Sequence, residues 1–297
     1  EMNLMGRLQH PHIAQIFDAG KTQDETAYLV MEWVEGSNIS QWCRERTLSL
    51  KARLALWLQV ADAVQAAHAA FIIHRDIKPA NVLIDKTNGV KVLDFGVAQS
   101  IAEAEQSAVD GFVHQYSRWY SQYYASPEQL SGAYVGTASD QYQLGLLLYE
   151  LIVGERLRVN QDPKEWPKTI ELISDARKQN AFEWAKVNDD LELIVRKLLH
   201  AKPEQRYPNL VDAQNDLHAW MQCRPISLRR QQGLYVMQRF VQRHWLPVSM
   251  LSLLFLLSIS FGVSSYYQSQ QLESAQASTL HQLQRSQRML GFLFDTI

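Results

Sequence analysis

The spacing of apolar and polar positions in the first third of the chain predicts short strands followed by a helix. Residues 13–17 and 27–34 are apolar runs separated by a polar turn, which is typical of two short strands. Ser49 precedes a stretch in which apolar residues recur every three or four positions, so we expect a long helix with this serine as its N-cap. Residues 82–84 and 90–93 flank another polar turn and predict a hairpin.

Beyond residue 136 the pattern becomes helical. Residues 94–136 form an irregular stretch rich in Ser, Gln and Tyr, and residues 142–153 are apolar on nearly every side, which indicates a buried helix. Amphipathic segments fill the chain to about residue 222. A few strands followed by many helices is the order of an α+β fold with a small sheet and a large helical body.

A segment of different character lies late in the chain, where residues 246–263 contain no charged side chain. A helix of this length approaches the ~30 Å thickness of a bilayer core, although a buried core helix is the alternative. Its flanks favour a membrane, because residues 224–244 before it contain five arginines and no acid. We therefore predict a basic juxtamembrane segment at 223–245 on the inside, a transmembrane helix at 246–265, and an outside segment at 266–297.

Composition excludes some functions and leaves others open. The chain is 46% hydrophobic and 20% charged, which is typical of a globular protein. Its formal net charge of −2 gives no reason to expect a nucleic-acid partner. Cys43 and Cys223 have no metal-ligand spacing, and we expect no disulfide framework. The basic stretch before the apolar segment could also rest on anionic lipid.

Two polar loops carry the residue types that phosphoryl transfer requires. Residues 74–81 read His-Arg-Asp-Ile-Lys-Pro-Ala-Asn, and residues 94–96 read Asp-Phe-Gly. One carboxylate can orient the attacking hydroxyl, a second carboxylate and an amide oxygen can hold Mg²⁺, and a lysine can offset phosphoryl charge. His-Arg-Asp alone or Asp-Phe-Gly alone is a weak signal. The eight-residue sequence followed by Asp-Phe-Gly, in this order, is specific.

In these motifs the chain resembles the protein kinase family, and in particular the bacterial membrane-bound serine/threonine kinases. The resemblance covers residues 1 to about 220 and implies a kinase fold over residues 1–222, with a partial small N-terminal lobe and a large helical C-terminal lobe. It implies that Asp76 is the catalytic base, that Asn81 and Asp94 hold magnesium, and that Lys78 contacts the γ-phosphate. ATP and Mg²⁺ would be the cofactors, and Ser and Thr of proteins the substrates.

The resemblance also assigns an adenine site. Met31 corresponds to the gatekeeper, and the backbone of Glu32 and Val34 would hydrogen-bond adenine. Leu83 would form the floor beneath the base. Without the family, Met31 and Leu83 could equally be ordinary core residues.

Further family landmarks are structural or regulatory. Glu128, in Ala-Ser-Pro-Glu, would be buried against Arg206, and Asp140 would tie its helix to the catalytic loop, residues 74–81. Arg75 would pair with a phosphorylated residue of the activation segment. Ser121 stands where the family has its substrate-positioning threonine. The candidate phosphorylation sites are Ser107, Ser117 and Ser121.

The sequence departs from the family at its beginning. It contains no Gly-rich phosphate loop and no strand lysine ahead of residue 1, and Glu1 falls where the family has the helix glutamate that pairs with this lysine. We therefore expect that the natural protein is longer, and that this chain alone binds ATP poorly and transfers phosphate slowly or not at all.

The segment after the predicted membrane helix is polar with spaced leucines. Two of the spacings are three and one is seven, which suits a heptad stripe, but a spacing of eight breaks it. An ordinary amphipathic helix, a helix that pairs in a homodimer, and the start of a sensor or repeat domain are all consistent with this pattern. The leucines are Leu272, Leu280, Leu283, Leu290 and Leu293.

Three functions compete. The first is a single-pass membrane kinase, by resemblance in a bacterial inner membrane, with a cytoplasmic catalytic domain that phosphorylates proteins in response to an outside signal. The second is a catalytically silent, pseudokinase-like membrane scaffold, which the missing lysine and glycine loop would favour. The third is a small-molecule phosphotransferase, against which the Ser-Pro-Glu segment and Arg206 argue. The retained catalytic-loop residues favour the first.

Overall fold

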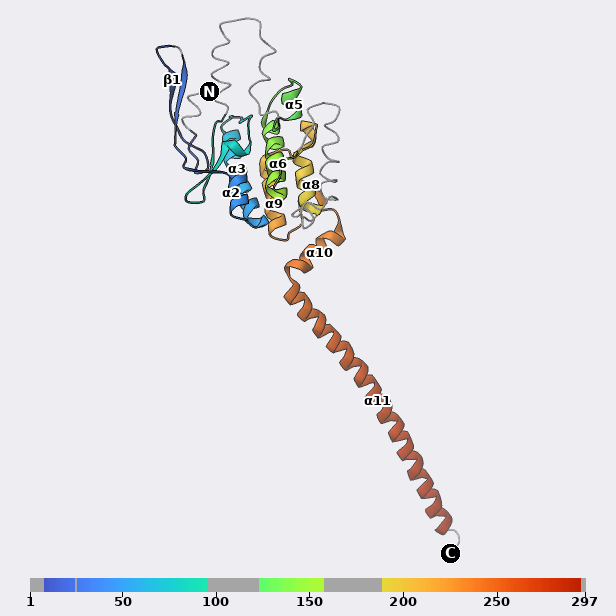
Figure 1. The fold of residues 1–297 in the computed structure, drawn as a ribbon. Helices are drawn as coiled ribbons and strands as arrows, with labels where there is room; N and C mark the ends of the chain where they lie inside the picture. Colours follow the sequence, from blue (N-terminus) through green and yellow to red (C-terminus); the bar gives the residue numbers. More distant parts are fainter. Residues whose placement is uncertain (1–7, 25, 96–122, 158–188, 295–297) are drawn as a thin grey trace. The chain divides into compact units, whose positions relative to one another are not determined.

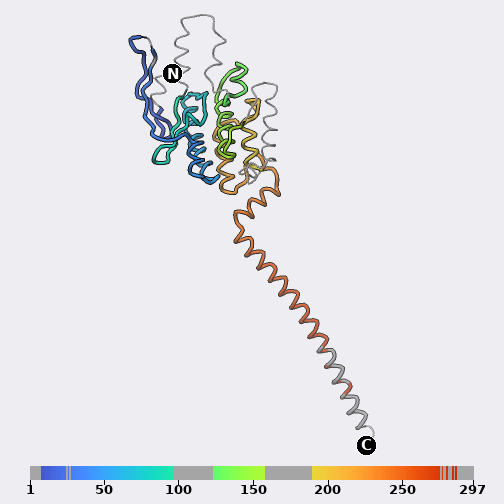
Figure 2. The backbone as a smooth tube through the Cα atoms, in the orientation of Figure 1, coloured from blue at the N-terminus to red at the C-terminus, as the bar shows by residue number. Residues whose placement is uncertain are grey.

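The computed structural model describes residues 8–24, 26–95, 123–157 and 189–294 (Figure 1). The chain divides into two compact units, Glu1–Tyr235 and Val236–Ile297. Figure 2 follows the backbone of each unit by residue number. The first unit contains the small sheets and the helical body, which confirms the α+β fold expected from the sequence.

The first two strands form an antiparallel pair. β1 (Ile16–Lys21) pairs with β2 (Ala27–Met31), with an irregularity in register near the start of β1. β1 begins later than the predicted strand at 13–17, because Ile13 is buried and forms an isolated parallel bridge with Val92 instead. β2 ends at Met31, before the end of the predicted run at 34.

A second sheet carries the end of the catalytic loop. Its antiparallel order is β3 (Gly36–Asn38), β4 (Val82–Asp85) and β5 (Val90–Val92). The predicted β4–β5 hairpin is confirmed, and the Asp85 carboxylate holds its turn by accepting from the backbone N–H of Thr87 at 2.8 Å and of Gly89 at 2.9 Å. Leu83 lies on the face of β4 opposite its two buried neighbours.

Gly36 is required by the close approach of β3 to β4. A Cβ at this position would lie 2.0 Å from the carbonyl oxygen of Ile84. We expect Gly36→Ala to lower the free energy of unfolding by about 1–3 kcal/mol, because backbone atoms must shift to admit the methyl group. Urea denaturation measures the loss. Gly233→Ala is the control, since nothing lies within 4 Å of a Cβ there, and equal unfolding energies for the two variants would contradict the prediction.

The helical body packs around two long central helices, α3 (Leu50–Ala69) and α6 (Thr137–Val153). The long helix α3 packs against α6 and α9, and α8 packs against the same two helices (Figure 1). The Ser49 hydroxyl accepts from the N–H of Ala52, which confirms the predicted cap of α3. The helices of the body are α2 (Ile39–Glu45), α3 (Leu50–Ala69), α5 (Pro127–Leu130), α6 (Thr137–Val153), α8 (Asp189–Leu198) and α9 (Leu210–Met221), with 3-10 turns at Pro79–Asn81, Pro203–Gln205 and Ser227–Arg229.

α6 begins five residues before the predicted apolar stretch at 142–153. Asp140, Gln141 and Gln143, within its first two turns, are buried although they are polar, because their side chains form hydrogen bonds with residues of other segments. The helix ends at Gly154, whose φ of 85° closes the C-terminus in the left-handed conformation. Polar side chains with partners in other elements therefore account for the missed turns.

Two buried aspartates form hydrogen bonds with the segment that follows α9, between residues 227 and 235. Asp216 of α9 accepts from the backbone N–H of Ser227 at 2.6 Å and from its hydroxyl at 2.8 Å. Asp190 of α8 accepts from Arg229 at 3.0 Å and from the Tyr235 hydroxyl at 2.6 Å. Because these contacts hold the chain beyond α9, the first compact unit extends past residue 222, where the predicted kinase domain ends.

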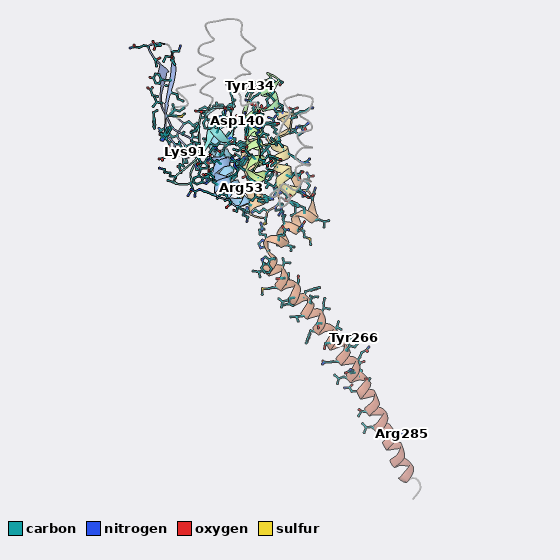
Figure 3. All side chains as sticks on the ribbon, in the orientation of Figure 1. Arg53, Lys91, Tyr134, Asp140, Tyr266 and Arg285 are labelled. Atoms are coloured by element: carbon teal, nitrogen blue, oxygen red, sulfur yellow. The ribbon has the colours of Figure 1, made fainter. Side chains whose placement is uncertain are left out.

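The second unit is helical. α10 (Gly233–Arg243) begins in the first unit and continues into the second. α11 (Trp245–Phe294) is one continuous helix across residues 265 and 266, where the sequence predicted the end of the transmembrane helix and the start of the outside segment. Within the described ranges, one helix is long and apolar enough to cross a membrane, Trp245–Ser274, and none of its apolar stretch is buried. Figure 3 shows Tyr266 and Arg285 projecting from α11.

Candidate active site

A single buried carboxylate shapes the start of the catalytic loop. Asp140, labelled in Figure 3, lies in the first turns of α6 and is fully buried. Its two oxygens accept from the backbone N–H of His74 at 2.9 Å and of Arg75 at 2.8 Å. Arg75 has a φ of 70°, an unfavourable conformation for a residue with a side chain. These two bonds therefore hold a strained turn in place.

Two glutamines and a histidine add to this support, and the sequence analysis missed them. Gln143 lies one helical turn after Asp140, accepts from Ile77 N–H at 2.7 Å and donates to the Arg75 carbonyl at 2.7 Å. Gln129 donates to the same carbonyl at 2.7 Å. His68 of α3 lies 2.7 Å from Asp140. The spacing of three between Asp140 and Gln143 was the available signal, because it places both on one helix face.

The structure brings Asp76, Lys78 and Asn81 together. The Lys78 ammonium lies 2.6 Å from Asp76 Oδ2. Asn81 Nδ2 donates to the Asp76 carbonyl at 2.9 Å and to Asp76 Oδ2 at 3.1 Å. Asp76 and Lys78 are partly exposed and Asn81 is buried. The carboxylate is thus held by two donors while it still borders solvent.

Asp94 is held near Asn81 by a backbone hydrogen bond of the preceding residue, Leu93. The N–H of Leu93 donates to the Asn81 carbonyl at 2.8 Å, and the exposed Asp94 follows with a φ of 56°. In the part of the chain that the structure describes, Asn81 Oδ1 and the Asp94 carboxylate make no hydrogen bond or ion pair, so both are available to a cation. Oxygen ligands of this kind fit Mg²⁺. No cluster of three His, Cys, Asp or Glu side chains among the described residues could hold a metal by itself.

His74 is a packing residue in this arrangement. Its ring is 1% exposed and lies 4.6 Å, centroid to centroid, from the ring of Phe95, which is also buried. Burial lowers the pKa of His74, and the nearby carboxylates of Asp140, Asp76 and Asp94 only partly oppose this shift. The imidazole is therefore neutral at physiological pH.

The predicted adenine site lies at the end of β2. The Glu32 N–H donates to the Gln15 carbonyl at 2.7 Å. Of the two backbone groups of Glu32, the carbonyl is therefore the one left for a ligand. Partial burial raises the pKa of Glu32, but hydrogen bonds from Lys91 and from Gln15 N–H outweigh this and lower it overall. Met31, Val34 and Leu83 are all partly exposed, as residues bordering a ligand would be.

Glu128 and Arg206 form a bidentate buried pair. Arg206 Nη1 lies 2.6 Å from Glu128 Oε1, and Nη2 lies 2.8 Å from Oε2. Arg206 also donates to the carbonyls of Ala138 and His200, and the Ser139 hydroxyl donates to Glu128. Burial raises the pKa of Glu128, but the hydrogen bonds and charge of Arg206 outweigh burial and lower it. The pair joins α5 to the segment between α8 and α9.

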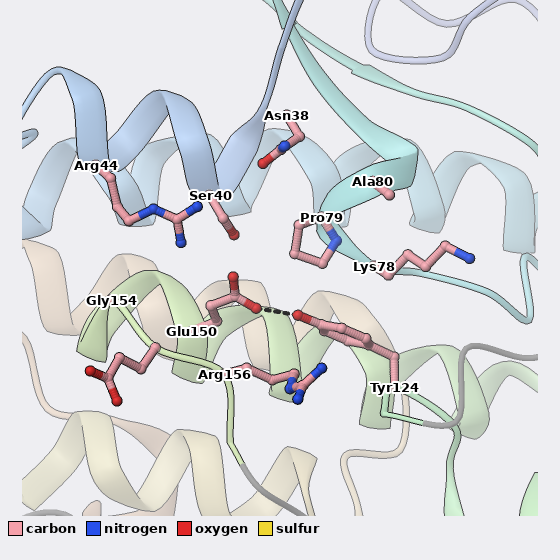
Figure 4. Close-up of a pocket in the computed structure, with 11 residues that line it drawn as sticks. Asn38, Ser40, Arg44, Lys78, Pro79, Ala80, Tyr124, Glu150, Gly154 and Arg156 are labelled. Atoms are coloured by element: carbon pink, nitrogen blue, oxygen red, sulfur yellow. Dashed lines mark hydrogen bonds between the residues drawn. The ribbon is translucent and has the colours of Figure 1, made fainter.

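A cleft of about 730 Å³ opens beside the catalytic loop (Figure 4). Its walls include Ser40 and Arg44 of α2, Lys78, and Glu150 of α6. The Tyr124 hydroxyl donates to the Glu150 carboxylate, and burial together with this carboxylate raises the pKa of Tyr124. The Ser40 hydroxyl is buried and has no hydrogen-bond partner in the described ranges. The cleft is therefore lined by polar groups as well as by Lys78.

Some predicted residues lie outside the described part of the chain. These are Glu1, Ser107, Ser117 and Ser121, so neither the lysine-pairing role of Glu1 nor the phosphorylation of the three serines is tested. Arg75 is described and lies next to Asp76, but its predicted partner, a phosphorylated residue of the activation segment, is not among the described residues.

Comparison with known proteins shows which family the chain matches. Residues 1–220 match the protein kinase domain. A probable serine/threonine-protein kinase from Clostridium perfringens is 37% identical over 155 residues, which is 52% of this chain and 22% of the relative. The serine/threonine-protein kinase PrkC from Bacillus subtilis is 34% identical over 212 residues, covering 71% of this chain and 31% of the relative.

A third relative has a similar identity and covers a similar share of the chain. The serine/threonine-protein kinase PknB from Mycobacterium leprae is 33% identical over 220 residues, again 71% of this chain and 33% of the relative. The chain thus spans at most about a third of the length of these curated relatives. Since the match to the family extends over most of the chain, the chain belongs to the protein kinase family, as a Hanks-type domain homologous to bacterial serine/threonine kinases.

Proposed function

We propose that the protein transfers the γ-phosphoryl group of ATP to Ser and Thr hydroxyls of other proteins. The observation that carries this proposal is the Asp76 carboxylate, held by Lys78 and Asn81 in a loop that Asp140 fixes. A carboxylate fixed in this way and still bordering solvent can receive a substrate hydroxyl. The cleft beside Lys78 is the place for the substrate polypeptide.

Each residue of the group has a role in this proposal. Asp76 orients the Ser or Thr hydroxyl and takes its proton as the oxygen attacks phosphorus. Lys78 offsets the charge on the transferred group. Asn81 Oδ1 and the Asp94 carboxylate are the oxygens that would hold Mg²⁺, and the Glu32 carbonyl and Val34 N–H would hold adenine. Bound Mg-ATP would supply the phosphoryl group.

The second part of the proposal is anchoring in a membrane. The exposed apolar helix from Trp245 to Ser274 supports a single span, and the arginines before it support an inside location for the catalytic domain. The protein would then be a signalling kinase of a bacterial inner membrane, with residues 266–297 on the outer side. Pairing of two copies through this outer segment is part of the same proposal.

Labelled ATP tests the catalytic part of the proposal. The protein expressed from its own start codon should incorporate phosphate into itself or an added protein, and the products should be phosphoserine and phosphothreonine. Removal of divalent cations with EDTA should abolish incorporation, and added Mg²⁺ should restore it, since two oxygen ligands cannot replace the cation. Failure of the full-length protein to incorporate label with Mg²⁺ present would instead support the silent membrane scaffold.

A further inference from the structure

α10 carries an apolar face that is open to solvent. The exposed fractions of its apolar side chains are 87% for Leu234, 65% for Met237, 51% for Phe240 and 37% for Val241. At 3.6 residues per turn these four positions fall within about a third of the helix circumference. Scattered apolar residues on a surface are ordinary, but four on one face of an 11-residue helix form a contact surface.

The face that α10 uses for packing is a different one. Tyr235 is buried, and its hydroxyl donates to Asp190 at 2.6 Å, while Arg229 lies over its ring at 4.8 Å. Tyr235 is one residue, or about 100°, away from Leu234 around the helix. The hydrogen bond to Asp190 therefore uses the side of α10 that carries Tyr235, which is not the side that carries the apolar face.

The charged residues that adjoin α10 in the sequence are all basic. Arg224, Arg230 and Arg243 are exposed, and the sequence has no acidic residue from Arg224 to Leu272. Basic residues beside an apolar helix face match an anionic lipid surface, which attracts such residues by about 1 kcal/mol per charge. A protein partner would need an acidic rim to match the same arginines.

α10 is also continuous with the candidate membrane helix. Only His244 separates the last residue of α10 from Trp245, the first residue of α11. Trp245 is 63% exposed, and an amphipathic ring at this position is typical of the headgroup zone. A helix joined so closely to a membrane span cannot lie far from the bilayer surface.

We propose that α10 is an interfacial membrane helix. Leu234, Met237, Phe240 and Val241 enter the boundary between headgroups and acyl chains, and the neighbouring arginines contact anionic headgroups. This inference rests on the proposed anchoring by α11 and adds a second contact with the same bilayer. It differs from the resting of a basic stretch on lipid, because the apolar face inserts.

Nitroxide labels in the full chain test the insertion. Cys223→Ser removes the accessible native thiol, while Cys43 is buried and its pKa is raised to about 11, which leaves it unreactive. Labels are then placed singly by Met237→Cys and Val241→Cys on the apolar face, and by Gln238→Cys and Gln242→Cys as controls on the polar side. Collisions with oxygen and with a water-soluble nickel chelate are measured in vesicles of phosphatidylcholine and phosphatidylglycerol.

Labels at 237 and 241 should collide with oxygen severalfold more, and with nickel severalfold less, than labels at 238 and 242. The contrast should shrink in vesicles of phosphatidylcholine alone. Equal nickel collisions at all four positions would overturn the inference, and so would shielding of 237 and 241 from both reagents, which indicates a protein partner. A label from Leu254→Cys separates the two proposals: if it reports hydrocarbon, anchoring by α11 stands whatever α10 does, and if it reports water, anchoring fails.

Discussion

Asp76→Asn should lower the rate of phosphate transfer by about 10²–10⁴-fold, which is the usual contribution of a positioned general base. Asparagine has the same shape as aspartate, and its amide oxygen can still accept from Lys78 and Asn81, which now lie 2.6 and 3.1 Å from Asp76 Oδ2. The loop therefore keeps its arrangement while the proton acceptor is lost. The measurement is kcat with labelled Mg-ATP in the full-length protein.

The matched control for this variant is Asp62→Asn, because the Asp62 side chain is 61% exposed and contacts His10 at 3.2 Å, outside the catalytic loop. It should transfer phosphate at the unaltered rate. Thermal unfolding of both variants shows whether the loss is chemical or structural. Retention of full activity by a folded Asp76→Asn protein would remove Asp76 from the proposed role.

Arg206→Met should lower the free energy of unfolding by about 3–5 kcal/mol, because it leaves the buried Glu128 carboxylate without its cation. The carbonyls of Ala138 and His200 lose a donor at the same time. Urea denaturation of the purified protein measures the change. The exposed Glu204→Gln is the surface control and should stay within about 0.5 kcal/mol. A loss for Arg206→Met as small as that of the control would show that the pair contributes little.

The same pair should make stability depend on acid. The pKa of Glu128 is lowered in the folded protein from an ordinary value of 4.5, so its contribution is complete above about 4.5 and is lost as the pH falls through the lower folded pKa. A Glu128→Leu and Arg206→Met double variant should lack this component and should be less destabilised than Arg206→Met alone. An unchanged acid dependence in the double variant would assign it to other carboxylates.

Local signals predicted the elements whose determinants are adjacent in sequence. The hydroxyl of Ser49 lies three residues from the N–H it accepts from, and the turn of the β4–β5 hairpin is held by its own Asp85. The catalytic-loop residues Asp76, Lys78 and Asn81 likewise lie within six residues, and their side chains are in hydrogen-bond contact in the structure, while their catalytic roles stay predictions. In such cases the sequence neighbourhood contains the partners, and pattern and structure agree.

Elements set by distant partners were missed. β3 is three residues long, too short for any alternation, and it exists because Gly36 meets the backbone of Ile84 far along the chain. The early turns of α6 read as polar, yet they are buried because Asp140 and Gln143 bond to a loop more than sixty residues earlier. Hydropathy cannot distinguish a polar residue that faces water from one that faces a buried backbone N–H.

The hydrogen bonds to Asp190 and Asp216 bear on how the first compact unit of this protein should be isolated. A fragment cut directly after α9 would end at Met221 and lose Ser227, Arg229 and Tyr235, which donate hydrogen bonds to these carboxylates. Asp190 would lose the hydrogen bonds from Arg229 and Tyr235. Asp216 would keep the bond from the Tyr207 hydroxyl at 3.0 Å but lose both bonds from Ser227. An expression boundary that respects this chemistry extends through Tyr235, where the hydrogen-bonded domain ends, even though the last helix of its body ends earlier.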